Sequence, residues 1–516
     1  MSRPLLVLGL DGYEASVADH LLAEGRMPNL SALIADSTRC RLEHGEAKRS
    51  GLAWEHFSLG REPSAYGRHA AVHFDPRTYG VTQDGTALKP FIGDIDKRVL
   101  IFNVPYFDML AAPNCKGLVS WGAHDAGVEA QCAPASLAEE VEAKFGPYPE
   151  TPYIYGFVWP DPDKARAMAE GLVRAVDQRG AIGHWLCTER LPDWDMAVMV
   201  ISEFHSAIEA LWHGYDADHP LHHLPSAAAA RDGIIGVYEA FDRLLGLYRR
   251  TIPQVDFAVF SMHGMGANDS DVPTMALLPE LMYRASFGKG LLEPRPDWRV
   301  PPDAIPMLRP REKWSGPVRA CLRHPPGSVE SLERSSLDWM PAAMYRRYWP
   351  AMEAFALPSY YDGRIRLNLA GRERDGRVSV ADYGAKLDWI CALLEECRDP
   401  RTSAPVVASI ARPVAADPLR AGPTEADLVV IWHGSPLALQ HKRLGLIGPI
   451  PFRRTGGHSG GGGVGYLTSS RLGGGDIGTV SAFDMVPTLI DLLDAPLPGY
   501  ISGRSFDPRT KRNGPA

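Results

Sequence analysis

Residues 5–12 read Leu-Leu-Val-Leu-Gly-Leu-Asp-Gly. A short, continuous apolar run of this kind is typical of a strand that is buried on both faces of a parallel sheet. The run stops at Asp11-Gly12, and residues 14–24 read as a helix. The order predicts a buried strand, a carboxylate at its carboxyl end, and then a helix.

The same order of strand and helix recurs along the chain. Apolar strands are predicted at 194–201, 255–261 and 426–432, and an amphipathic helix is predicted at 485–493. Strands that alternate with helices imply an α/β fold in which helices cover both faces of a mostly parallel sheet.

Two stretches rich in Pro, Gly and aromatic residues interrupt this alternation, at 61–150 and 270–345. We interpret both as inserted cap segments over the carboxyl edge of the sheet. The predicted core is then divided among residues 1–60, 151–269 and 346–516.

The composition narrows the class of protein. Of 516 residues 45% are hydrophobic, which is enough for a large buried core, and the net charge of −8 argues against nucleic-acid wrapping and against a basic membrane-surface protein. The sequence has no apolar run of membrane-spanning length and no signal-peptide pattern.

Seven scattered cysteines without a Cys-x2-Cys pair do not suggest disulfides or a thiolate zinc site. We expect a cytoplasmic protein without a membrane partner, and the oligomeric state stays open.

Polar side chains that follow the predicted strands are candidates for a site, because open α/β sheets bind ligands at the carboxyl ends of their strands. They are Asp11, His205, His263 and, in a Gly-rich loop, His458. Taken singly, each such residue is more often a helix-cap or turn residue than a ligand. Their shared position is what makes them candidates.

Several blocks together resemble a known family. Residues 9–12 (Gly-Leu-Asp-Gly) and 25–30 (Gly-Arg-Met-Pro-Asn-Leu) resemble the opening of the alkaline phosphatase superfamily, in particular its type I phosphodiesterase/nucleotide pyrophosphatase branch. Further blocks are similar to that branch in the same order, at 50–67, 194–213, 261–266, 368–373, 399–400, 427–430, 454–458 and 481–503.

The resemblance implies a phosphohydrolase in which two metals activate a hydroxyl nucleophile that forms a covalent intermediate. By position, the nucleophile would be Ser50. Lys48 and Arg49, which precede it, could attract a phosphate, and His56 or His263 could serve as a base if the neighbouring metal is missing.

The metal ligands implied by the resemblance depart from the family's pattern. One site would hold His205, Glu209 and His458, with imidazole and carboxylate exchanged along the helix relative to the family. The other would keep Asp11 and His263, because Met262 stands where the family has an aspartate and a thioether is a poor ligand for such metals. We therefore expect one firm metal site and a second that is weak or absent. Zinc is the expected metal, with manganese or iron as alternatives.

The resemblance favours metal-dependent hydrolysis of a small-molecule phosphate ester, a phosphodiester or nucleotide-like substrate, through Ser50. It also admits sulfatases and phosphonate hydrolases, but residues 50–54 (Ser-Gly-Leu-Ala-Trp) lack the Pro and Arg of the sulfatase motif, which disfavours the sulfatases. Two alternatives stay open: a single-metal hydrolase or transferase that acts on another substrate class at the two-His-one-Glu site, and a non-catalytic paralogue that binds a phosphate-bearing ligand.

Overall fold

The apolar run near the N-terminus forms strand β1 (Leu5–Leu10), and all six of its residues are buried. β1 pairs in parallel with β8 (Met196–Ile201) on one side and with β9 (Asp256–His263) on the other. The three predicted strands at 5–10, 194–201 and 255–261 are thus direct neighbours at the centre of one sheet. This computed structural model describes residues 3–83, 85, 88–122, 129–149, 157–301, 304–324, 335–413 and 417–507.

Within these residues, the large sheet has nine strands in the order β19-β2-β18-β9-β1-β8-β5-β6-β7. The strands not yet introduced are β2 (Thr38–Glu43), β5 (Val99–Phe102), β6 (Cys115–Val119), β7 (Gln131–Ala133), β18 (Gly462–Thr468) and β19 (Gly475–Ser481). β18 runs antiparallel to both neighbours and β7 is antiparallel to β6, whereas the other pairs are parallel. The predicted mostly parallel α/β sheet is therefore confirmed.

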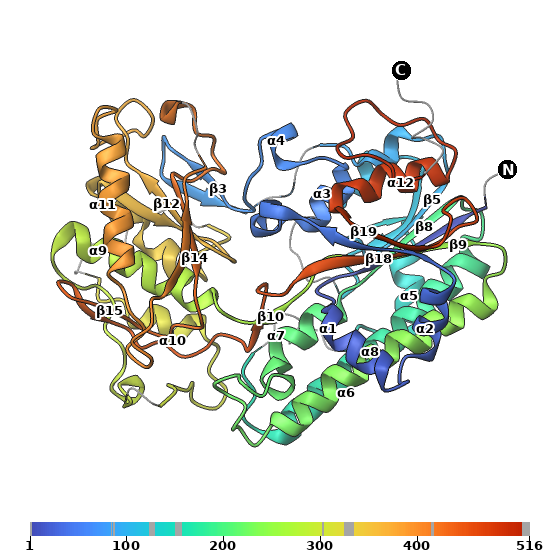
Figure 1. Ribbon diagram of the computed structural model, residues 1–516, viewed down its shortest axis with the longest axis horizontal. Coiled ribbons are helices and arrows are strands. Elements are labelled where there is room, and N and C mark those ends of the chain that lie inside the picture. Colours follow the sequence, from blue (N-terminus) through green and yellow to red (C-terminus); the bar gives the residue numbers. More distant parts are fainter. Residues whose placement is uncertain are drawn as a thin grey trace.

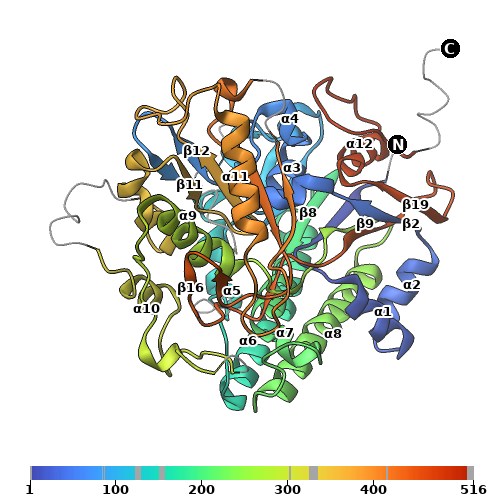
Figure 2. The same cartoon turned by 60° about the vertical axis from the view of Figure 1, so that its left-hand side comes forward.

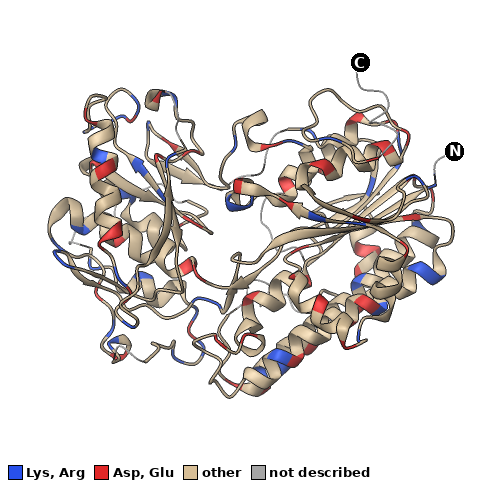
Figure 3. Ribbon diagram, in the orientation of Figure 1, with Lys and Arg blue, Asp and Glu red and all other residues tan. Residues whose placement is uncertain are grey.

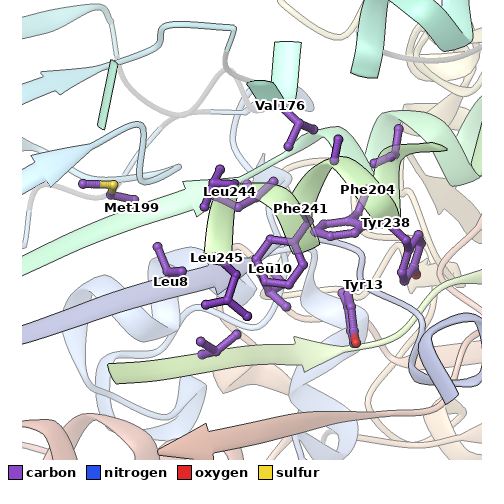
Figure 4. Close-up of a cluster of buried hydrophobic side chains, with 14 of the residues drawn as sticks. Leu8, Leu10, Tyr13, Val176, Met199, Phe204, Tyr238, Phe241, Leu244 and Leu245 are labelled. Carbon is purple, nitrogen blue, oxygen red and sulfur yellow. The ribbon is translucent and has the colours of Figure 1, made fainter. Parts of the chain in front are cut away.

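Helices cover both faces of this sheet (Figure 1). One face carries α1 (Ala15–Ala23), α2 (Pro28–Ala35), α5 (Leu137–Phe145), α6 (Pro162–Trp185), α7 (Glu203–Tyr215) and α8 (Ala227–Thr251). The other carries α3 (Ala53–Leu59) and α12 (Met485–Leu492). Figure 4 shows how the first face is filled: Leu8 and Leu10 of β1 lie among the aromatic and aliphatic side chains of α7 and α8.

A second lobe lies beside the first and has a hydrophobic core of its own (Figures 1 and 2). Its sheet has the strand order β11-β12-β14-β13 and is antiparallel throughout. These strands are β11 (Ala354–Leu357), β12 (Gly363–Leu367), β13 (Val407–Ala411) and β14 (Leu428–Trp432). The helices α9 (Leu278–Phe287), α10 (Ser315–Ala320) and α11 (Tyr383–Glu395) belong to the same lobe.

The remaining helix and strands are short. They are α4 (Pro63–Tyr66), β3 (His73–Asp75), β4 (Gly80–Thr82), β10 (Gly266–Ala267), β15 (Leu439–His441), β16 (Gly445–Ile447) and β17 (Gly456–Gly457). Of these, β10 and β17 pair with each other in the antiparallel sense.

The structure corrects the predicted domain boundaries. Residues 61–150 are not simply a cap, because they supply β5, β6 and β7 to the large sheet. Residues 346–516 are not simply core, because β11 to β14 build the second lobe together with residues of the 270–345 segment. The predicted strand at 426–432 exists as β14, but it pairs in the antiparallel sheet, where its apolar side chains fill the second core.

In the described part of the chain, no helix combines the length and the apolar character needed to cross a membrane. Basic and acidic residues are interspersed along the ribbon of both lobes (Figure 3).

Candidate functional site

One edge of the large sheet gathers a set of polar side chains from distant parts of the chain. Asp11 directly follows β1, His205 lies in the first turn of α7 after β8, and His263 is the last residue of β9. His458 precedes β18, which is antiparallel, so the start of β18 lies at this same edge and Gly462 pairs with His263. The carboxyl-edge rule therefore accounts for the convergence.

His205 is the centre of this cluster. Its Nε2 atom lies 3.1 Å from Nε2 of His458 and 3.4 Å from Oε1 of Glu209, one turn along α7. Its Nδ1 atom lies 3.6 Å from Oδ2 of Asp11. The ring of His263 lies 5.4 Å, between ring centroids, from that of His458. An imidazole pair with a carboxylate on either side can accept a proton and pass it on.

A pocket of about 450 Å³ opens beside this cluster. His205, Glu209 and Gly51 contribute to its wall. The rest of the lining includes aromatic side chains and cations, namely Tyr106, Phe157, Trp314, Trp339, Tyr360, Tyr361, Lys313, Arg453 and Arg454. Such a lining suits an anionic group that is attached to an apolar or aromatic body.

Ser50 lies next to the pocket and is buried, at the end of a 3-10 turn that precedes α3. Its hydroxyl donates to the Ala47 carbonyl at 2.7 Å and accepts from the Leu52 amide at 3.1 Å. Gly51 has a φ of 75°, and a Cβ there would lie 2.8 Å from the ring of Tyr361. That ring in turn packs 3.9 Å from the ring of His458, measured between centroids. The Ser50 turn, Tyr361 and His458 are therefore consecutive neighbours.

The three residues predicted as weak substrate contacts make other interactions. Lys48 Nζ donates to the Gly460 carbonyl at 3.3 Å, and Arg49 Nε donates to Glu46 at 3.2 Å. His56 is buried, and its Nδ1 atom lies 3.0 Å from Nε2 of His44. Burial lowers the pKa of His56 to about 3, so its imidazole is neutral at physiological pH.

Met262 does not face the cluster. Its side chain is part of the hydrophobic core on the α3 and α12 face of the sheet. The position at which the family has a ligand aspartate is thus a core position in this chain, and the thioether fills space.

Burial dominates the electrostatics of the cluster. It raises the pKa of Asp11 to about 7, against the opposing effect of the Trp54 indole, which donates to Asp11 Oδ1 at 2.9 Å. It also lowers the pKa of His263 to about 4 and holds that of His44 well below the usual range. Burial therefore favours the uncharged forms of Asp11, His263 and His44 at this edge of the sheet.

Sequence reasoning missed Arg454, which lies four residues before His458. Its side chain is buried, Nη1 contacts Oε1 of Glu209, and Nε donates to Oδ2 of Asp271 at 2.8 Å. The signal was present only as an arginine inside the block 454–458. Tyr361 was missed as well, because it does not belong to a recognisable motif.

The predicted metal centre can be compared with this arrangement. A metal held by His205, Glu209 and His458 would need the Glu209 carboxylate, which the Arg454 guanidinium contacts. Among the residues that the structure describes, no group of three or more His, Cys, Asp or Glu side chains is arranged to hold a metal ion. As they are arranged, the residues fit neither a two-metal centre nor the single zinc site.

Comparison with known proteins gives results for structure alone. No protein-family model and no curated protein matches the chain in sequence. Among solved structures, phosphonoacetate hydrolase from Sinorhizobium meliloti in complex with phosphonoformate matches with a TM-score of 0.50 and 13% identity, over 96% of this chain and 95% of that one. A variant of alkaline phosphatase PafA matches with a TM-score of 0.51 and 10% identity, over 98% and 99%. Murine ectonucleotide pyrophosphatase/phosphodiesterase 5 in complex with AMP matches with a TM-score of 0.47 and 10% identity, over 98% of each chain.

The similarity to phosphonoacetate hydrolase and PafA extends over nearly the whole of both chains. It agrees with the mostly parallel sheet covered by helices. The chain shares the fold of these two solved structures.

Proposed function

We propose that this chain hydrolyses the phosphate ester of a small molecule in the pocket beside His205 and His458, with Ser50 as the nucleophile. The observation that carries the proposal is the convergence of Asp11, His205 and His458 at the sheet edge, directly beside a cationic pocket. The superfamily fold supports it, since the solved structures that share this fold include an alkaline phosphatase and a phosphonoacetate hydrolase.

The lining of the pocket suits the proposed substrate class. Lys313 supplies positive charge for a phosphate group, and Arg453, which also pairs with Asp271, adds a guanidinium of the kind that matches the geometry of phosphate oxygens. The Arg454 guanidinium in the same lining is paired with Glu209 and Asp271. The aromatic side chains of the lining would pack against the organic part of the ester. A phosphodiester or nucleotide-like substrate has both features.

In the proposed reaction, the Ser50 hydroxyl turns from the Ala47 carbonyl towards the pocket and its oxygen bonds to phosphorus. The proton of the Ser50 hydroxyl passes to the imidazole pair of His205 and His458. The bond from phosphorus to the leaving alcohol oxygen breaks, and that oxygen takes the proton from the imidazole pair. Water then attacks phosphorus, the bond from phosphorus to the Ser50 oxygen breaks, and a proton of the water passes through the imidazole pair to the Ser50 oxygen, which restores the hydroxyl and releases the phosphate product. No step is assigned to a metal, because Arg454 contacts the carboxylate that a metal would need.

A second candidate is binding of a phosphate-bearing ligand without turnover. Two observations favour it: the Ser50 hydroxyl has hydrogen-bond partners within its own turn, and the Glu209 carboxylate is engaged by Arg454. The cationic pocket serves both candidates equally, so binding alone does not separate them.

The test is hydrolysis of chromogenic phosphate monoesters and diesters, measured with chelator and with added zinc or manganese. We expect turnover by the natural chain and a loss of about 10³-fold or more in Ser50→Ala. Ser37→Ala is the matched control, because the Ser37 hydroxyl also donates to a carbonyl three residues earlier, that of Ile34, but at the opposite end of β2.

Equal turnover by Ser50→Ala and the natural chain would exclude Ser50 as the nucleophile. No turnover under any metal condition, together with a rise in melting temperature on adding a phosphate ester, would replace hydrolysis by the binding function.

A further inference from the structure

The strongest unassigned feature is a buried bridge of two carboxylates and one guanidinium at the wall of the pocket. Glu209, Asp271 and Arg454 are 0%, 1% and 4% exposed, respectively. Arg454 Nη1 contacts Oε1 of Glu209, and Arg454 Nε donates to Oδ2 of Asp271 at 2.8 Å. Carboxylates buried to this degree need a counter-charge, and here one planar guanidinium serves two of them.

The backbone fixes this guanidinium in place. The Thr455 amide donates to the Glu209 carbonyl at 2.8 Å, so the loop that carries Arg454 is attached to α7. At the next residue, a Cβ on Gly456 would lie 2.1 Å from the Ile208 carbonyl oxygen, which shows how closely the loop approaches the helix. Gly456 also pairs with Ala267 of β10. The backbone contacts of residues 455 and 456 therefore fix the position of Arg454.

The guanidinium and a metal would compete for the same atom. Oε1 of Glu209 faces His205 Nε2 at 3.4 Å, and His205 Nε2 faces His458 Nε2 at 3.1 Å. Ligand atoms around a tetrahedral zinc ion with bonds of about 2.1 Å lie roughly 3.4 Å apart, so these two spacings are close to those between zinc ligands, although the three side chains as arranged do not form a metal site. The atom that would complete the site is the one that Arg454 contacts.

We propose that Arg454 is the resident cation of this site, in the place where the fold would otherwise hold a metal, and that its removal opens a zinc site on His205, Glu209 and His458. The inference concerns the same pocket as the proposed function but does not depend on hydrolysis. It also gives the Glu209 carboxylate a role in this chain, because the carboxylate is the partner of the arginine.

The experiment is zinc binding to the full chain, after chelator treatment, by calorimetry with zinc chloride and by the visible absorption of added cobalt. We expect no tight site in the natural chain. In Arg454→Gln we expect one equivalent of zinc, bound about 100-fold or more tightly than by the natural chain, because the carboxylate is released. In this variant Asp271 still has two side-chain partners, Arg453 at 2.6 Å and Asn268 at 2.9 Å. The carboxylate that loses its counter-charge is therefore that of Glu209.

Two further variants locate the new site. Arg454→Gln/Glu209→Gln should lose the gained zinc, whereas Arg454→Lys, which keeps a cation, should gain none. The proposal is overturned by one tight equivalent of zinc in the natural chain that Glu209→Gln removes, or by a folded Arg454→Gln that gains none.

Folding supplies a second readout. If Arg454→Gln does not fold in metal-free buffer, refolding with zinc should restore its circular dichroism, since the metal replaces the missing charge. Failure of zinc to restore the fold would show that a metal does not substitute for the guanidinium, and would overturn the proposal.

Discussion

Gly51 shows how one residue positions the wall of the pocket. It adopts a left-handed φ of 75° between the Ser50 turn and α3, and its missing side chain leaves room for the ring of Tyr361. The Tyr361 ring packs against His458. An L side chain at this position would therefore be strained and would also push on the ring.

Gly51→Ala is expected to lower the free energy of unfolding by about 1–2 kcal/mol and to weaken binding of a phosphate ester. The measurement is urea unfolding together with ligand titration. Gly45→Ala is the matched control, because Gly45 also has a positive φ of 56° but a Cβ added there would meet nothing within 4 Å. Equal effects of both substitutions would show that the contact with Tyr361 has no role.

Single residues also show where sequence reasoning succeeded and where it stopped. Asp11, His205 and His458 could be named because each follows or precedes a strand end, and strand ends share one edge. Arg454 could not be given a role, because its ion-pair partner Asp271 lies 183 residues away in the sequence. Charge pairs over such separations are decided by tertiary packing, which no local pattern records.

At the scale of elements, the helix layer beneath the large sheet contains a buried ion pair. Arg179 of α6 donates to Glu203 of α7 at 2.7 Å, and both side chains are at most 1% exposed. A buried pair contributes little net stability as a whole, but loss of one partner leaves an uncompensated charge.

Arg179→Met should therefore destabilise the chain by about 3–5 kcal/mol in guanidinium chloride unfolding. The control lies on the neighbouring surface: Arg243 of α8 pairs with Asp177 of α6 at 3.1 Å, and both side chains are about half exposed. Arg243→Met should change the stability by less than about 1 kcal/mol. Comparable losses of stability in both variants would contradict the argument that burial of the Arg179–Glu203 ion pair makes its disruption costly.

The elements themselves were predictable in part. β1, β8 and β9 follow from short, continuous apolar runs, and α12 follows from a clear helical period, because burial on both faces or on one face leaves these patterns. β5 escaped notice because it has only four residues, Val99–Phe102, among Pro-rich and Gly-rich loops. β14 was predicted as a strand of the parallel sheet, but it pairs with β12 in the antiparallel sheet. An apolar run predicts a buried strand and carries no information about which strand it pairs with.

At the scale of the whole molecule, several buried histidines stabilise the fold only while neutral, and His213 and His219 are two that lie outside the candidate site. His219 is buried and has two backbone partners. Its Nε2 atom is 3.1 Å from the Thr455 carbonyl oxygen, and its Nδ1 atom accepts from the Leu221 amide at 3.0 Å. Burial lowers the pKa of His219 to about 4 and that of His213 to about 3. Protonation would break the bond from the Leu221 amide.

Below pH 6.5 the unfolded chain binds protons on these histidines that the folded chain does not, so the stability falls as the pH falls from about 6.5 towards 4. We expect this loss in urea unfolding midpoints measured across that range. His213→Gln should reduce the slope, whereas substitution of the exposed His223 by Gln should leave it unchanged. Identical slopes in all three proteins would contradict the argument.

The most direct test of the proposed hydrolysis is to trap its covalent intermediate. The natural chain is mixed with a phosphate ester, quenched in acid within the first turnover, digested and analysed by peptide mass spectrometry. The account predicts a phosphoryl adduct on the peptide that contains Ser50, and none in Ser50→Ala. Turnover accompanied by an adduct on another residue, or turnover that persists in Ser50→Ala, would contradict it.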